Sequence, residues 1–288
     1  MNGPVICLPD GGAPAPGRWH ALCQAMTTRE LLGWVVLLFG GENLARSVSG
    51  AAGNGVGHGS WSIIDGIVWG CALLLLWRDG RGRPASRWQL AGILPIIAAA
   101  PLLAGNIVYG AVLLIGMIVV RGAGWSPNER RFGMILISIG VCRVLSKLIV
   151  MLFADAILRA DTALAGILMT AVVPGSTWTA NTIHPPHDVG ITVAMACSSF
   201  ANLSLVSLCY TSMALLDGAV LSLRNIIAVG SACLMVIVFN TVRLMLMARS
   251  LAAYVYWHDG AGATTFGIIL SLVTVAMCSL GSRWANPR

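Results

Sequence analysis

Charged residues are scarce in this sequence. Only 10% of its 288 residues are Asp, Glu, Lys or Arg, whereas 57% belong to the hydrophobic set. Soluble globular domains carry about 25% charged residues, so this chain lacks the side chains that would cover a water-facing surface. Its hydrophobic residues fall into repeated runs near the length of about 20 residues that crosses a bilayer. The composition therefore excludes an ordinary soluble domain and predicts an all-α polytopic membrane protein.

Closely spaced cysteine pairs are also missing. The eight cysteines show no Cys-x-x-Cys spacing, and several lie in hydrophobic runs, where a thiol usually behaves as a small hydrophobic group. His184 and His187 in "HPPHD" flank two prolines, which prevent a helical histidine pair, and no third ligand is evident nearby. We expect no metal site, no cofactor and no disulfide framework.

No nucleic-acid-binding motif accompanies the net charge of +7. The arginines are instead concentrated in short loops between hydrophobic runs, as in 78–87 and 121–131. Clusters of this kind mark the cytoplasmic loops of membrane proteins. The first 30 residues contain no apolar core with a cleavage site, so residues 1–30 are expected to form a cytoplasmic N-terminal segment without a removable signal peptide.

The hydrophobic runs predict about eight transmembrane helices. A break near Pro101, Gly105 and Asn106 divides the long run 90–120 into two short spans. A shorter hydrophobic piece at 162–174 is expected to be an interfacial or re-entrant segment within 160–190. The remaining spans are expected at 31–48, 61–77, 132–154, 191–216, 226–246 and 262–282.

Arginine-rich loops place both termini in the cytoplasm. Arg243 and Arg249 break this pattern, because they fall at the outer end of the seventh span. Cys197, about two turns into the sixth span, and His258, just before the eighth, lie on the same outer side. Since consecutive spans form hairpins, we expect Cys197, Arg243 and His258 to converge at the outer face.

These three residue types suit acyl transfer. An ionised thiol is a strong nucleophile, an imidazole can move its proton, and an arginine can hold a developing oxyanion. Asp259 adjoins His258 and could orient its ring. Each residue has a structural alternative: the cysteine as a small hydrophobe, the arginine as an interfacial anchor and the histidine as an interface residue. Their joint placement is what favours an enzyme.

Charged side chains within the predicted spans also require an explanation, since each costs a few kcal/mol near the bilayer centre. In two cases the charges are four residues apart and share a helix face. Glu42 and Arg46 can pair with each other, whereas the like charges of Arg143 and Lys147 require carboxylates or an anion opposite them. Together these side chains predict a polar chamber that opens outward. Structural ion pairs between helices are the alternative. The residues are Glu42, Arg46, Asp65, Arg143 and Lys147.

Three ordered motifs resemble those of the exosortase/archaeosortase family of membrane-embedded cysteine transpeptidases. They are "ACSSF" with Cys197, "NTVR" with Asn240 and Arg243, and "HDG" with His258. The likeness covers roughly residues 160 to 282. The family usually has glycine where this chain has Ser199, and an acidic residue often stands two before the cysteine, where this chain has Met195. These departures leave the Cys, Arg and His motif residues in place and bear on which substrate motif and which subfamily the resemblance implies.

The resemblance implies that Cys197 is the nucleophile, Arg243 the oxyanion and carboxylate partner and His258 the proton shuttle. Ser198 would help to line the oxyanion site, with Asn240 and Asp259 as supporting residues. The chain would then divide into N-terminal transmembrane helices (31–158) and a catalytic transmembrane region (159–288).

The resemblance also implies the substrate. The expected partner is a membrane-anchored protein with a C-terminal sorting signal: a short motif such as Pro-Glu-Pro, a membrane helix and a basic tail. Cleavage would pass through a thioester at the outer, periplasmic face of the inner membrane. The acyl group would go to an acceptor nucleophile that the sequence does not identify.

Two other functions remain open at this point. A membrane acyltransferase could use the same cysteine to move a lipid or polysaccharide group. A transporter could use the intramembrane charges, although the spans show neither an internal repeat nor paired broken helices.

Overall fold

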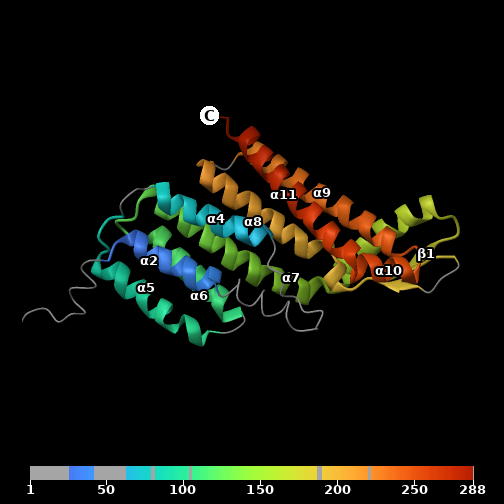
Figure 1. Ribbon diagram of the computed structural model, residues 1–288, viewed down its shortest axis with the longest axis horizontal. Helices are drawn as coiled ribbons and strands as arrows, with labels where there is room; N and C mark the ends of the chain where they lie inside the picture. The colour runs from blue at the N-terminus through green and yellow to red at the C-terminus, as the bar shows by residue number, and fades with distance from the viewer. Residues whose placement is uncertain are drawn as a thin grey trace, which may run out of the picture.

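The computed structural model describes residues 26–41, 63–78, 82–103, 106–186, 190–219 and 222–287. Helices dominate it, and one small sheet lies at one end, beside α10 (Figure 1). The helices are α2 (Thr28–Val35) with the π-helical η1 (Val36–Gly40), α4 (Ile63–Arg78), α5 (Arg87–Ala99) with the 3-10 turn η2 (Ala100–Leu102), α6 (Asn106–Arg121), α7 (Pro127–Val172), α8 (Ser199–Asp217), α9 (Leu223–Met247), α10 (Leu251–His258) and α11 (Ala261–Ala285).

Among the described residues, three helices are long and apolar enough to cross a membrane: α7, α9 and α11. Helices α5 and α6 are apolar but shorter. Large hydrophobic side chains point outward on the long helices, among them Leu234 on α9 and Leu272 on α11, which are more than half exposed. A surface of this kind suits lipid rather than water. The long apolar helices and this surface point to a helical membrane protein.

The predicted break within 90–120 is confirmed as a change of helix. Helix α5 ends at Ala99, the turn η2 contains Pro101, and α6 begins at Asn106. A proline supplies no backbone N–H to a helix, so the turn interrupts the hydrogen-bond ladder there.

Helices α6 and α7 pack closely through glycines. A Cβ added at Gly116 on α6 would lie 2.7 Å from the Gly133 carbonyl oxygen, and one added at Gly140 would lie 2.6 Å from Leu113 Cβ. Small residues that let two backbones approach are typical of helix pairs in membranes. This contact fixes α7, along which the candidate site is built.

The start of α7 and its course are set locally. Ser126 and Glu129 form a capping box around Pro127 at the first helical position. The helix then runs to Val172 with a kink at Phe153, where φ is −126° and ψ is 17°. The kink falls at the end of the predicted span 132–154, and the predicted segment at 162–174 lies, up to Val172, within the helical part that follows the kink. No proline interrupts the stretch, so the helix continues past the kink until it meets Pro174.

A small three-stranded antiparallel sheet follows α7, in the region where an interfacial segment was expected, and the described residues are otherwise mainly helical, as predicted. Its strands, in spatial order, are β1 (Thr177–Thr179), β2 (Thr182–His184) and β3 (Ile191–Thr192). The ring of Trp178 on β1 lies against Gly166 of α7, where an added Cβ would come within 2.5 Å of it. The sheet is thereby docked on the second half of α7.

The predicted span 191–216 also begins later than expected. Residues 191–197 form β3 and the 3-10 turn η3 (Met195–Cys197), and α8 starts only at Ser199. Helix α8 packs against α4, α7, α9 and α11. The end of the molecule where β3, η3, α9 and α10 meet holds a hydrophobic cluster of its own.

Candidate active site

Cys197 is the last residue of η3 and is 4% exposed. It does not lie two turns inside a helix, as predicted, because Ser198 is extended (φ −70°, ψ 144°) and caps α8 from outside. Its side chain belongs to the hydrophobic cluster at this end, whose other fully buried members are Ala165, Met169, Ile183, Val193, Leu244, Met247 and Ala248. The thiol is thus held in an apolar pocket between α7, the sheet and α9.

Asp161 of α7 holds the chain directly after Cys197. Ser198 Oγ donates to Asp161 Oδ2 at 2.7 Å, and the Ser199 backbone N–H donates to the same oxygen at 3.0 Å. Ser199 Oγ donates to Oδ1 of the same carboxylate. Ser198 Oγ also accepts from the Phe200 N–H at 3.2 Å. The Ser198 hydroxyl is therefore a helix-capping group here.

Sequence reasoning missed Asp161. It lies far upstream of Cys197, in a stretch that was expected to be interfacial. An acidic residue at the start of the apolar run 162–174 was the signal that could have singled it out.

Asn240 of α9 holds Cys197 from the other side. Its Nδ2 donates to the Cys197 carbonyl oxygen at 2.9 Å, and Asn240 is 1% exposed. A buried carbonyl without a partner would be costly, so the amide fixes the position of the turn.

Arg243 lies one turn after Asn240 on α9. Its Nε and Nη2 donate to the Trp257 carbonyl oxygen at 3.3 and 3.1 Å. Its Cζ lies 5.5 Å from the centroid of the Phe266 ring. The guanidinium therefore joins α9 to the end of α10 and the first turns of α11.

His258 ends α10, one residue after Trp257. Its Nδ1 lies 2.8 Å from Asp259 Oδ1, and its ring stacks on Tyr254 with centroids 4.8 Å apart. Tyr254 in turn packs against the cluster that contains Cys197. The carboxylate fixes Nδ1, so Nε2 is the nitrogen that a neutral ring offers as a base.

Burial raises the pKa of the Cys197 thiol, the charge of Arg243 lowers it, and Asp259 raises it again; the balance lies above the ordinary value. The resting residue is therefore a protonated thiol at neutral pH. In the described part of the chain neither Arg243 nor His258 hydrogen-bonds that thiol. Reaction at Cys197 consequently requires a base that meets the thiol when a substrate is bound.

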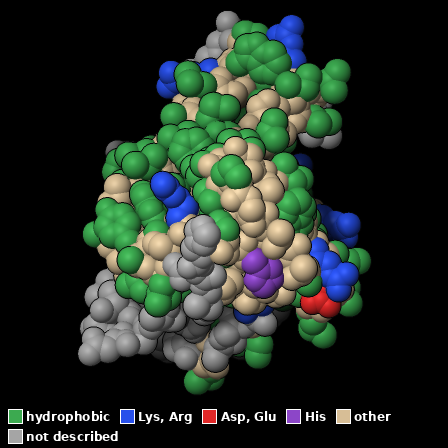
Figure 2. Space-filling model, turned by 90° about the vertical axis from the view of Figure 1, so that its right-hand side faces the viewer, with side chains coloured by type: hydrophobic (Ala, Val, Ile, Leu, Met, Phe, Trp, Pro, Cys, Tyr) green, Lys and Arg blue, Asp and Glu red, His purple; other side chains and the backbone are tan. Residues whose placement is uncertain are grey.

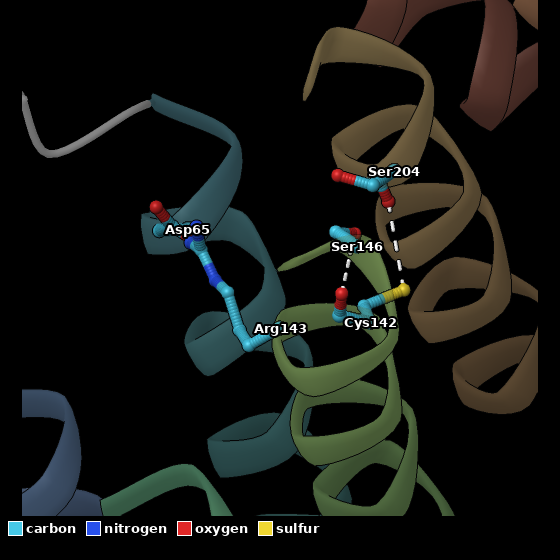
Figure 3. Close-up of polar contacts among 5 residues, drawn as sticks. All are labelled: Asp65, Cys142, Arg143, Ser146 and Ser204. Atoms are coloured by element: carbon cyan, nitrogen blue, oxygen red, sulfur yellow. Dashed lines mark hydrogen bonds and ion pairs between the residues drawn. The ribbon is translucent and has the colours of Figure 1, made fainter. Parts of the chain in front are cut away.

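Two of the predicted chamber charges form an ion pair. Arg143 of α7 reaches across to Asp65 of α4 (Figure 3), which is an ion pair between helices of the kind that the structural alternative predicted. Both residues line a cleft of about 530 Å³, together with Arg243 and Phe266. Lys147 lines a neighbouring cavity of about 360 Å³ that also includes Arg143.

The remaining chamber residues, Glu42 and Arg46, lie outside the described residues, as does His187. His184 bonds Thr179 within the sheet, with Nε2 and Oγ1 2.9 Å apart. In the described ranges no group of three or more His, Cys, Asp or Glu side chains could hold a metal ion.

Figure 2 views the molecule from the side that carries the sheet and α10. Many hydrophobic side chains lie on this face, together with several Lys and Arg side chains and few acidic ones. A membrane or an apolar segment could approach the site from here.

Comparisons of this chain with protein-family models, with curated proteins and with solved structures found no match.

Proposed function

We propose that this chain is a membrane-embedded cysteine peptidase or transpeptidase. One observation carries the proposal: Asn240 holds the Cys197 carbonyl, and Arg243, one turn further along α9, holds the carbonyl directly before His258. A thiol, a guanidinium and an imidazole–carboxylate pair are thereby gathered at one end of the helical bundle. These are the groups that thiol-dependent acyl transfer uses.

The reaction begins with a peptide carbonyl placed against Cys197 Sγ. His258 Nε2 takes the thiol proton, and Asp259 stabilises the imidazolium that results. The thiolate attacks the carbonyl carbon, and free N–H groups of Arg243 donate to the oxyanion. His258 then protonates the leaving amine, which leaves a thioester on Cys197. Water or an acceptor nucleophile attacks the thioester and restores the thiol.

The proposed substrate is a membrane-anchored protein with a C-terminal sorting signal. The motifs around Cys197, Arg243 and His258 support this class, as does a cleft of about 530 Å³ that adjoins Arg243. We place the site at the outer face of the inner membrane, with both termini in the cytoplasm and about eight spans. The arginine-rich loops support that orientation.

The test is cleavage of a tagged substrate that ends in a short motif, a hydrophobic helix and a basic tail, co-expressed with the full chain. Cys197→Ala should abolish processing, and Arg243→Gln and His258→Gln should each reduce it by about 100-fold or more. Cys233→Ala, on α9 and half-buried, is the matched control and should retain processing. Unchanged processing by Cys197→Ala would refute the proposal.

Trapping distinguishes the neighbouring functions. In His258→Gln, a peptide acyl group on Cys197 detected by mass spectrometry supports a peptidase, whereas a lipid or sugar acyl group supports an acyltransferase. Movement of a solute by vesicles containing Cys197→Ala would instead indicate a transporter.

A further inference from the structure

The geometry points to Asp161 as a positioning residue for the Cys197 nucleophile. The inference rests on the proposed function for its catalytic consequence. Its structural part concerns the turn that carries the thiol, and can be tested without any substrate.

Asp161 is a buried carboxylate with an unusual set of partners. It is 6% exposed, and no basic side chain contacts it within the described ranges. A buried charge is costly unless hydrogen bonds or an opposite charge compensate it. All three of its hydrogen bonds come from Ser198 and Ser199, the two residues that follow Cys197. The hydrogen bonds that stabilise this carboxylate therefore all come from one turn, the turn that carries Cys197.

The same turn is the start of α8. Ser198 is the N-cap and Ser199 the first helical residue, so the carboxylate lies at the positive end of a helix of 19 residues. The helix end and the carboxylate stabilise each other. Because Asp161 belongs to α7, it ties the second half of that helix to the turn.

Cys197 is thereby fixed from two sides. Asn240 of α9 donates to the Cys197 carbonyl oxygen. Asp161 of α7 accepts from the backbone N–H of Ser199, two residues further along the chain. A nucleophile must be held within a fraction of an ångström of its productive position. Ser199, which stands where the resembled family has glycine, supplies the hydroxyl that bonds the second carboxylate oxygen. In this chain Ser199, the residue that departs from the motif, is thus a hydrogen-bond partner of Asp161.

Loosening the turn should have two opposite effects. The buried thiol becomes more accessible to a small alkylating reagent, because the turn opens. Attack on a bound peptide becomes slower, because the thiol is no longer held in place. General destabilisation would instead expose all the buried thiols together.

The experiment is isotope-coded iodoacetamide labelling of the full-length protein in lipid nanodiscs, with each cysteine quantified by mass spectrometry. Asp161→Asn keeps the side-chain size but weakens the hydrogen bonds, and should speed Cys197 alkylation about tenfold. Cys71, Cys209 and Cys278, buried in the helical core, should stay protected as in the wild type. Ser199→Gly should give a smaller increase, and combining it with Asp161→Asn should add little.

An unchanged Cys197 rate in Asp161→Asn would overturn the inference. If that variant exposes all the buried thiols, Ser199→Gly decides instead, and an unchanged Cys197 rate there overturns it. In the cleavage assay Asp161→Asn should lower kcat and leave KM near the wild-type value. Failure of the wild type to cleave any sorting-signal substrate would refute the proposed function, while the labelling result would still decide the role of Asp161.

Discussion

Arg243 and Asp259 act in opposite directions on the Cys197 thiol, which provides a matched pair of substitutions. Burial raises the pKa of Cys197, Arg243 lowers it, and Asp259 raises it. Arg243→Gln should therefore raise that pKa further, and Asp259→Asn should lower it. Because the thiolate is the form that reacts, alkylation at a fixed pH should slow in the first variant and speed up in the second.

The size of each effect follows from the surroundings of the charge. Arg243 lowers the pKa of Cys197 by more than Asp259 raises it, although the Arg243 charge is shared with a carbonyl and a ring. Loss of this nearby positive charge should slow alkylation of Cys197 about tenfold in Arg243→Gln. The Asp259 side chain is 46% exposed, and water screens its charge, so Asp259→Asn should speed alkylation about threefold.

The assay measures the rate of Cys197 alkylation in the full-length protein from about pH 6.5 to about pH 10.5, a range that brackets an ordinary thiol pKa. The wild-type rate should still be climbing in the alkaline range. Arg243→Gln should move the profile to higher pH and Asp259→Asn to lower pH. Arg243→Lys keeps the charge and should leave the profile nearly in place. Shifts of both variants in the same direction, or no shift in Arg243→Gln, would refute this electrostatic account.

Three further substitutions test the supports of the site. Asn240→Leu leaves the Cys197 carbonyl without its buried donor and should lower the free energy of unfolding by about 1–3 kcal/mol in a denaturant titration. Ser231→Ala, on the exposed side of α9, is the control and should be nearly neutral. Gly140→Val forces α7 away from Leu113 and should cost about 1–3 kcal/mol by thermal unfolding, whereas Gly110→Ala, with no atom within 4 Å of the new Cβ, should have little effect. Asp65→Asn removes the partner of Arg143 and should cost about 1–2 kcal/mol, a value reduced because the Arg143 side chain is 33% exposed; adding Arg143→Gln should recover part of the loss.

The placement of the segments that carry Cys197, Arg243 and His258 at one end of the bundle could be expected from the order of the elements in the chain. Helices α8 and α9 form one hairpin and α9 and α11 another, so Cys197, Arg243 and the segment before α11 are brought to one end. Hydrophobic runs and the break at Pro101 also gave the main helices. Both signals are local, since they depend on hydropathy and on a missing backbone donor.

The fixing of Cys197 was not predictable from local signals. Hydropathy does not distinguish a residue inside a helix from one in a turn before it when both are apolar, so the span was extended back to residue 191. The helix start is set by Ser198 together with a carboxylate from another helix, and a contact of that kind has no local signature.

Loss of activity on removing Arg243 would not by itself assign the oxyanion role, because Arg243 also caps a helix. The Trp257 carbonyl is one of the last in α10 and has no partner within that helix, and Arg243 supplies two N–H groups to it. Arg243→Ala would free the end of α10 and with it His258. A guanidinium has five N–H donors, so three remain for an oxyanion while the cap stays in place. Arg243→Lys separates the charge from the planar fork of donors. A lysine that restores the alkylation profile but leaves cleavage about 100-fold down would show that the fork of donors, and not the charge alone, is needed in the reaction.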